Sequence, residues 1–194
     1  DGQQIVTASW DMTAKVWRTE IGYELAPLIG HDSRVERITY SPDGKRILTA
    51  SLDGTAKVWD PETTQEIVSL IGHKDGVMTA VYSLDGQWIV TASMDTTAKI
   101  WDRKTGQEII TLIGHKGEIV TATFSPDQQR ILTASYDGTA KVWDAETGQE
   151  LVTLAGHIGE VTSASYSPNG QRVVISGADQ TARMYTTDIN ELLQ

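Results

Sequence analysis

Every histidine of the chain follows a glycine, and consecutive Gly-His pairs lie 42 residues apart. A serine, an aspartate and a tryptophan follow each of the first three histidines at fixed offsets. The three sets are His31, Ser51, Asp53 and Trp59; His73, Ser93, Asp95 and Trp101; and His115, Ser135, Asp137 and Trp143. Serine, histidine and aspartate are the residue types of a hydrolytic triad, and histidine is also the commonest metal ligand.

Repetition favours a structural use of these sets over a chemical one. An active site needs one exposed nucleophile beside an oxyanion hole, whereas these groups recur in unit after unit. The sequence also contains no glycine-rich phosphate loop, no His-Glu-x-x-His motif and no EF-hand spacing. We therefore expect no catalytic residue, no metal site and no cofactor.

The elements that position the sets belong to a repeat that covers nearly the whole chain. A period of 42 residues fits either helical repeats of the HEAT type or the blades of a propeller. Turn signals such as Ser41-Pro42-Asp43-Gly44 and Asp53-Gly54 recur too often for long helices, and the runs between them are rich in valine, isoleucine and threonine. We expect four strands in each unit, at 35–41, 46–51, 55–60 and 65–71 in the first complete copy.

The frame of Gly-His followed by TASxDxTAKVWD resembles the WD-repeat β-propeller family, and the near-identical copies resemble its bacterial members. The resemblance covers essentially all 194 residues and implies an all-β fold of about four and a half blades, each of four antiparallel strands. The blade portions are 1–30, 31–72, 73–114, 115–156 and 157–194. It also implies that each set forms a hydrogen-bonded tetrad, in which the aspartate accepts from the imidazole and the serine hydroxyl joins the imidazole to the indole N–H.

The two ends of the repeat region differ from its middle. The last copy has Gly177 and Tyr185 in place of the serine and the tryptophan, so its tetrad is expected to be incomplete. The first copy begins at Asp1-Gly2, which matches the turn Asp43-Gly44 in the next copy. Because propeller rings usually close with ~4–8 blades, we expect the chain to be the C-terminal portion of a longer propeller. The rival interpretation is that two copies associate to complete one ring.

Positions that vary from copy to copy are free to serve a partner. The position before the turn aspartate is large and apolar in four of five copies, although it lies in a tight loop. Two further variable positions lie early in the first strand after Gly-His. In the family, such positions line the top face near the central channel, and packing between blades is the alternative. The partner-binding candidates are Trp10, Leu52, Met94, Tyr136, Glu36, Met78, Val120 and Arg37.

Trp88 is singular among the copies. Its column otherwise holds Gln4, Arg46, Arg130 and Arg172, and the tryptophan begins a predicted strand. Covering a strand edge and binding a ligand are equally good explanations of this residue.

Composition narrows the function classes. The net charge of −10 argues against a nucleic-acid binder, which normally has a basic surface. No apolar stretch approaches the ~18 residues of a membrane helix, and the absence of cysteine excludes disulfides and thiolate metal sites. We expect a cytoplasmic, non-enzymatic scaffold for a protein or peptide partner. The alternatives are a propeller hydrolase and a purely structural array that completes its ring by oligomerisation.

Overall fold

The described residues, 2–20 and 22–187, form eighteen strands and no helix in a computed structural model. The strands make five antiparallel sheets, each in simple up-and-down order. The first sheet comprises β1 (Gln4–Ala8), β2 (Ala14–Arg18) and β3 (Tyr23–Leu28), and the second β4 (Val35–Tyr40), β5 (Ile47–Ser51), β6 (Thr55–Trp59) and β7 (Glu66–Ile71). The third comprises β8 (Val77–Tyr82), β9 (Trp88–Ser93), β10 (Ala98–Asp102) and β11 (Glu108–Leu112), and the fourth β12 (Ile119–Phe124), β13 (Arg130–Ser135), β14 (Ala140–Asp144) and β15 (Glu150–Leu154). The fifth comprises β16 (Val161–Tyr166), β17 (Arg172–Gly177) and β18 (Ala182–Thr186).

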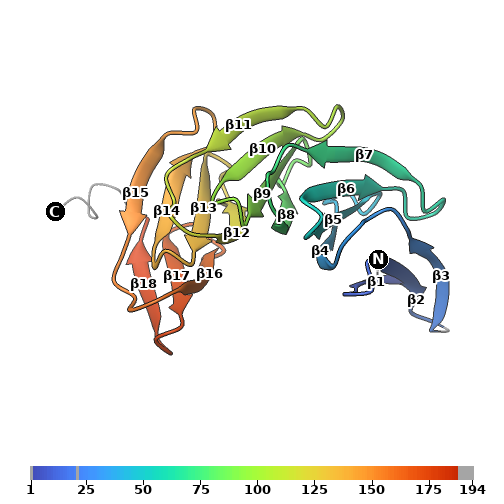
Figure 1. Cartoon of the computed structure of the whole chain (residues 1–194), viewed down its shortest axis with the longest axis horizontal. Coiled ribbons are helices and arrows are strands. Elements are labelled where there is room, and N and C mark those ends of the chain that lie inside the picture. Colours follow the sequence, from blue (N-terminus) through green and yellow to red (C-terminus); the bar gives the residue numbers. More distant parts are fainter. Residues whose placement is uncertain (1, 21, 188–194) are drawn as a thin grey trace.

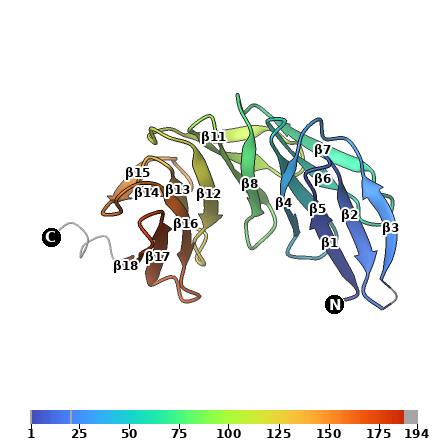
Figure 2. The ribbon, with the colours of Figure 1, turned by 60° about the horizontal axis from the view of Figure 1, so that its bottom comes forward.

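The five sheets follow one another round an open arc (Figure 1). The first strands β4, β8, β12 and β16 contact one another on the inside of the arc, and β7, β11 and β15 lie on its outside. Figure 2 shows the first and last sheets at opposite ends of the arc. The all-β propeller prediction is thereby confirmed, and the strands of the first complete copy lie within one residue of the predicted ranges.

The core consists of layers between neighbouring sheets. All five residues of β5 are buried, because this strand is covered on both faces by adjoining sheets. Trp59 is 1% exposed and packs with Val16 and Leu28 of the preceding sheet, and Trp101 packs with Val58 in the same way. Each tryptophan therefore joins its own sheet to the one before it.

A β-bulge interrupts the first strand of each of the last four sheets. In β4 the register passes from Val35 opposite Ser51 to Arg37 opposite Ala50, so that Glu36 is the extra residue. Met78, Val120 and Thr162 are the equivalent residues in the other three sheets. A bulge re-aims its side chain, so this column does not follow the alternation of a regular strand.

Each sheet has two ends with different loops. We call top the end that carries the Gly-His loops and the Ser-x-Asp turns, and bottom the end that carries the turns at 41–46 and 60–65 and their equivalents. No helix of the described chain has the length and apolarity to span a membrane.

Candidate functional site

In the second, third and fourth sheets, four polar groups meet at the top of the blade in a chain of hydrogen bonds that we call the clasp. In the third sheet, His73 Nδ1 lies 2.9 Å from Asp95 Oδ2, and His73 Nε2 lies 2.7 Å from Thr91 Oγ1. Trp101 Nε1 donates to the same Thr91 hydroxyl at 2.8 Å. The clasp thus runs from carboxylate to imidazole to hydroxyl to indole.

The same clasp is present in the second and fourth sheets. The bridging hydroxyl belongs to Thr49 and Thr133, at 2.7 and 2.8 Å from the imidazoles of His31 and His115. The indole nitrogens of Trp59 and Trp143 donate to these hydroxyls at 2.9 and 2.8 Å. His31 and His115 also contact their aspartates, Asp53 and Asp137, at 2.6 and 2.8 Å.

The prediction that serine supplies this hydroxyl was wrong. Ser93 Oγ instead donates to the Asp75 carbonyl at 3.0 Å and accepts from Asp95 N at 3.1 Å, so it pins the turn to the Gly-His loop. Ser51 and Ser135 do the same with the carbonyls of Ser33 and Gly117. The threonine and the serine stand two residues apart and therefore share a face of the strand. The imidazole Nε2 reaches the hydroxyl of the threonine, as His73 reaches that of Thr91.

Electrostatics fix the direction of the clasp. Burial lowers the pKa of His73, although Asp95 acts to raise it. Burial raises the pKa of Asp95, but hydrogen bonds from Thr97, Lys74 N and His73 outweigh it and lower that pKa to about 2. A neutral imidazole can then donate from Nδ1 to Asp95 and accept at Nε2 from Thr91, whose oxygen accepts from the indole. Every group has a partner of the right kind.

This arrangement supports structure, not hydrolysis. The bridging hydroxyls of Thr49, Thr91 and Thr133 are fully buried, so a substrate cannot reach them. Within residues 2–20 and 22–187, no group of three or more histidine, cysteine, aspartate or glutamate side chains is placed to hold a metal ion.

The last sheet keeps half of the clasp. His157 Nδ1 lies 2.9 Å from Asp179 Oδ1. Ile175 stands at the threonine position, and the hydroxyl of Tyr185, at the tryptophan position, donates to the Ala155 carbonyl. His157 Nε2 is consequently buried without a hydrogen-bond partner.

On the top face, two of the predicted candidates before the turn aspartate, Trp10 and Leu52, lie against the next blade. Trp10 is 68% exposed, and the guanidinium of Arg34 from the next sheet lies 4.6 Å from its ring centroid. Leu52 and Met94, from consecutive sheets, both flank Gly76: a Cβ there would lie 2.8 Å from Leu52 Cδ2 and 3.1 Å from Met94 Sδ. A side chain at position 76 would therefore push the ends of both neighbouring side chains aside.

Backbone hydrogen bonds hold these loops in place. The amides of Leu52, Met94 and Tyr136 each donate to the carbonyl of the Gly-His loop in their own sheet, at 2.9–3.0 Å. Tyr136 occupies the same position in the fourth sheet, and 38% of its surface is exposed. We call the set Trp10, Arg34, Leu52, Met94 and Tyr136 the top-face strip.

The candidates at the bulge position, Glu36, Met78 and Val120, differ in how deeply they are buried. Glu36 and Met78 are half-buried, whereas Val120 is 8% exposed and packs with Val161 and Ile175 between two sheets. Val120 is therefore wrong as a partner-binding candidate, because its side chain is buried between the fourth and fifth sheets. Arg37 is exposed and lines the hollow on the inside of the arc.

Five repeats in the chain match the WD40 family, described as WD domain, G-beta repeat, at residues 1–18, 22–60, 64–102, 106–144 and 148–186. The chain belongs to the WD-repeat family. A search of curated proteins found no matching relative. WD repeats generally mediate protein–protein interaction, and the family is typically non-enzymatic.

The WD repeats and the sheets are out of phase by one strand. The repeat at 22–60 contains β3 of the first sheet and β4, β5 and β6 of the second. Each of the four longer matches, from 22–60 to 148–186, therefore ties two neighbouring blades together through the covalent chain, whereas the match at 1–18 contains only β1 and β2 of the first sheet.

The WD-repeat top face also contains residues that the sequence analysis missed. Arg34 was overlooked, and so was the position after each histidine, which is exposed in all four copies. That position reads Asp32, Lys74, Lys116 and Ile158, so the same comparison of copies identifies it as variable.

Proposed function

We propose that this WD-repeat array is a non-enzymatic scaffold that binds a protein or peptide partner through the top-face strip. The observation that carries the proposal is the exposure of Trp10, 68%, beneath the guanidinium of Arg34. Tryptophan and arginine are enriched among residues that dominate binding energy at protein interfaces. The clasp leaves this surface free for binding because neither Trp10 nor Arg34 takes part in its hydrogen bonds.

The shape of the strip suits an extended partner. Its members come from four consecutive sheets, and the charged side chains of Lys74 and Lys116 are exposed in the Gly-His loops of two of these sheets. An apolar centre with a polar rim is typical of interfaces between proteins. The bacterial context, the cytoplasmic location and the completion of a ring by a second copy stay predictions.

The test replaces Trp10, Met94 and Tyr136 together by serine. The purified chain is immobilised, proteins captured from an extract are identified by mass spectrometry, and each captured protein is then titrated in purified form. We expect the triple variant to keep the urea midpoint within the range of ordinary surface substitutions and to weaken binding at least about tenfold.

The matched control replaces Leu84 and Tyr23 by serine, because these side chains are 69% and 63% exposed but lie outside the strip. We expect the control to bind its partner as the parent chain does. Undiminished binding by the triple variant, or equal loss in the control, contradicts the assignment of the strip.

A further inference from the structure

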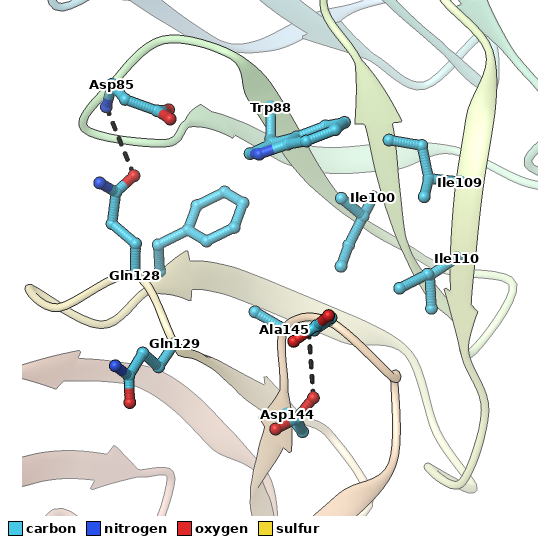
Figure 3. A pocket seen from close by; sticks show the side chains of 11 residues that line it. Asp85, Trp88, Ile100, Ile109, Ile110, Gln128, Gln129, Asp144 and Ala145 are labelled. Carbon is cyan, nitrogen blue, oxygen red and sulfur yellow. Dashed lines mark hydrogen bonds between the residues drawn. The ribbon is translucent and has the colours of Figure 1, made fainter.

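A cavity of about 550 Å³ opens at the bottom of the boundary between the third and fourth sheets (Figure 3). Its walls are apolar: Trp88, Ile100, Ile109 and Ile110 come from the third sheet, and Phe124 comes from the fourth. Figure 3 shows the ring of Trp88 over the cavity, with Ile100 and Ile109 beside it and Gln128 on the far side. The volume lies within the ~300–1,000 Å³ usual for small-molecule sites. We call this cavity the Trp88 pocket.

Three substitutions between copies account for the pocket. Arg46, Arg130 and Arg172 stand at the Trp88 position of other sheets, and Arg103 of the third sheet stands where the fourth has Ala145. The tyrosines Tyr40, Tyr82 and Tyr166 stand where the fourth sheet has Phe124.

The neighbouring boundaries show what those residues do. Between the fourth and fifth sheets, Arg130 Nη1 donates to the Thr187 carbonyl at 2.9 Å, and the remaining cavity is about 10 Å³. Between the second and third sheets, the Nε of Arg103 is buried. With Trp88 and Ala145 in these places, the third boundary has neither arginine, and its space is open and apolar.

Carboxylates surround this apolar space. The lining includes Asp85, Asp144 and Glu146, which are anionic at neutral pH, and no lysine or arginine is among the lining residues. The turn hydrogen bonds of Asp85 and Asp144 go to Oδ1 in both residues. The mouth of the pocket therefore has a negative charge that its own walls do not neutralise.

The pocket is held open by contacts between the two blades. The Asp85 amide donates to Gln128 Oε1 at 3.3 Å across the boundary. The turn that carries Asp144 packs against Ile110 so closely that a Cβ on Gly148 would lie 2.5 Å from Ile110 Cγ2, and Gly148 has a φ of +72°. A site whose walls are already in place loses little conformational entropy on binding.

We propose that the Trp88 pocket binds a small organic cation, namely an amine attached to an aromatic or branched alkyl body. The body removes its apolar surface from water against Trp88, Phe124 and the isoleucines, and the ammonium group lies among the carboxylates at the mouth. The electron-rich face of Trp88 adds a cation–π attraction. This inference does not rest on the top-face strip.

The test uses 4-phenylbutylammonium as the probe, measured by calorimetry and by saturation-transfer NMR with the whole chain. We expect binding in the micromolar to millimolar range, at least about tenfold tighter than that of 4-phenylbutyrate and several-fold tighter than that of 4-phenylbutanol. In the saturation-transfer spectrum we expect the signals of the probe's phenyl ring and of its butyl chain to lose intensity. Absence of binding at millimolar probe, or equal affinity for the carboxylate, overturns the proposal.

The deciding variant carries Trp88→Arg together with Ala145→Arg, which are the residues that other copies use at these positions. We expect this variant to fold and to lose at least about tenfold in affinity for the probe. Trp10→Ser is the control, because it removes an exposed tryptophan at the opposite end of the blades, and we expect it to bind the probe unchanged. Parental affinity in the double variant overturns the proposal.

A final experiment tests whether the natural ligand of the pocket is a free amine or a basic side chain of a peptide. The blocked dipeptide acetyl-Phe-Lys-amide carries a ring and an ammonium group on a peptide backbone. We expect it to bind no more tightly than the free amine. Binding at least about tenfold tighter than the amine would overturn the assignment to a small molecule and indicate a partner peptide.

Discussion

The clasps of the third and fifth sheets begin alike and end differently. Both pair a histidine with an aspartate at 2.9 Å. In the third sheet the relay continues through Thr91 to Trp101, whereas in the fifth Ile175 interrupts it and His157 Nε2 has no partner. The difference shows that the outer contact, between imidazole and carboxylate, forms without the inner one, between imidazole and hydroxyl.

The two halves of the clasp also have different surroundings. The inner half is enclosed by sheets on both faces, as the fully buried Thr91 and the 1% exposure of Trp101 show. In the fifth sheet the corresponding strand β18 is largely exposed. Buried polar groups are costly when unpaired. The inner half of the clasp therefore contributes more to stability in a blade that is covered on both sides than in the exposed fifth sheet.

The largest expected effect comes from Asp95→Ala. Asp95 accepts hydrogen bonds from His73, Lys74 N and Thr97, and its loss leaves these donors unpaired in a mostly buried site. We expect the free energy of unfolding to fall by about 3 kcal/mol, measured by urea denaturation. Asp179→Ala, in the half-clasp, is expected to cost less. An equal cost in both sheets would break the comparison.

Thr91→Val makes the third clasp resemble the fifth. It leaves His73 Nε2 and Trp101 Nε1 without a partner at nearly constant side-chain volume, so we expect a loss of about 2 kcal/mol. Ile175→Val is the matched control, for which we expect the roughly 0.5–1.5 kcal/mol of a lost methylene. A Thr91→Val variant as stable as the parent chain would show that the bridging hydroxyl has no structural weight.

The pH dependence of stability tests the neutral imidazole. Burial lowers the pKa of His31, His73 and His115 in the folded state. Below a pH of about 6.5 the unfolded chain therefore binds more protons than the folded chain, and stability falls as the pH drops further. We expect a lower urea midpoint at pH 5.5 than at pH 7.5, with added salt to screen the net negative charge. A midpoint that rises toward pH 5.5 would mean that the imidazoles are charged when folded.

Ser93→Ala is expected to have the smallest effect of the series. Its hydroxyl bonds only to the backbone of a top loop, through Asp75 O and Asp95 N, and the fifth sheet has Gly177 at this position. The variant loses both of these hydrogen bonds, and we expect a total loss of about 1 kcal/mol in the free energy of unfolding. Thermal and urea unfolding of Ser93→Ala and Thr91→Val, measured under the same conditions, provide the check. A Ser93→Ala loss larger than that of Thr91→Val would restore serine as the bridge.

The strands and the repeat were predictable because turn residues mark every strand end. The identity of the bridging hydroxyl was not. Thr49 and Ser51 recur together, point to the same face of β5, and are both absent from the last copy, where Ile175 and Gly177 replace them. No comparison among the copies separates the two columns, and the height of the imidazole above the strand decides between them.

The candidate surfaces were predictable to different extents. Trp10 and Tyr136 lie exposed as expected from their loop, but Val120 is buried against the fifth sheet, and the sequence does not distinguish it from the half-buried Glu36 and Met78 of the same column. The Trp88 pocket depends on Trp88, Phe124 and Ala145 meeting across a blade boundary. The sequence singled out Trp88 alone, since only the packing of two sheets brings the other two beside it.

The most direct test of the clasp is the protonation state of its histidines, read from the imidazole nitrogens in a two-bond ¹H–¹⁵N correlation spectrum at pH 7. The chain has four histidines, so each can be assigned by one substitution. The account predicts that His31, His73 and His115 are neutral and carry their proton on Nδ1. Imidazolium signals, or protons on Nε2, would contradict it.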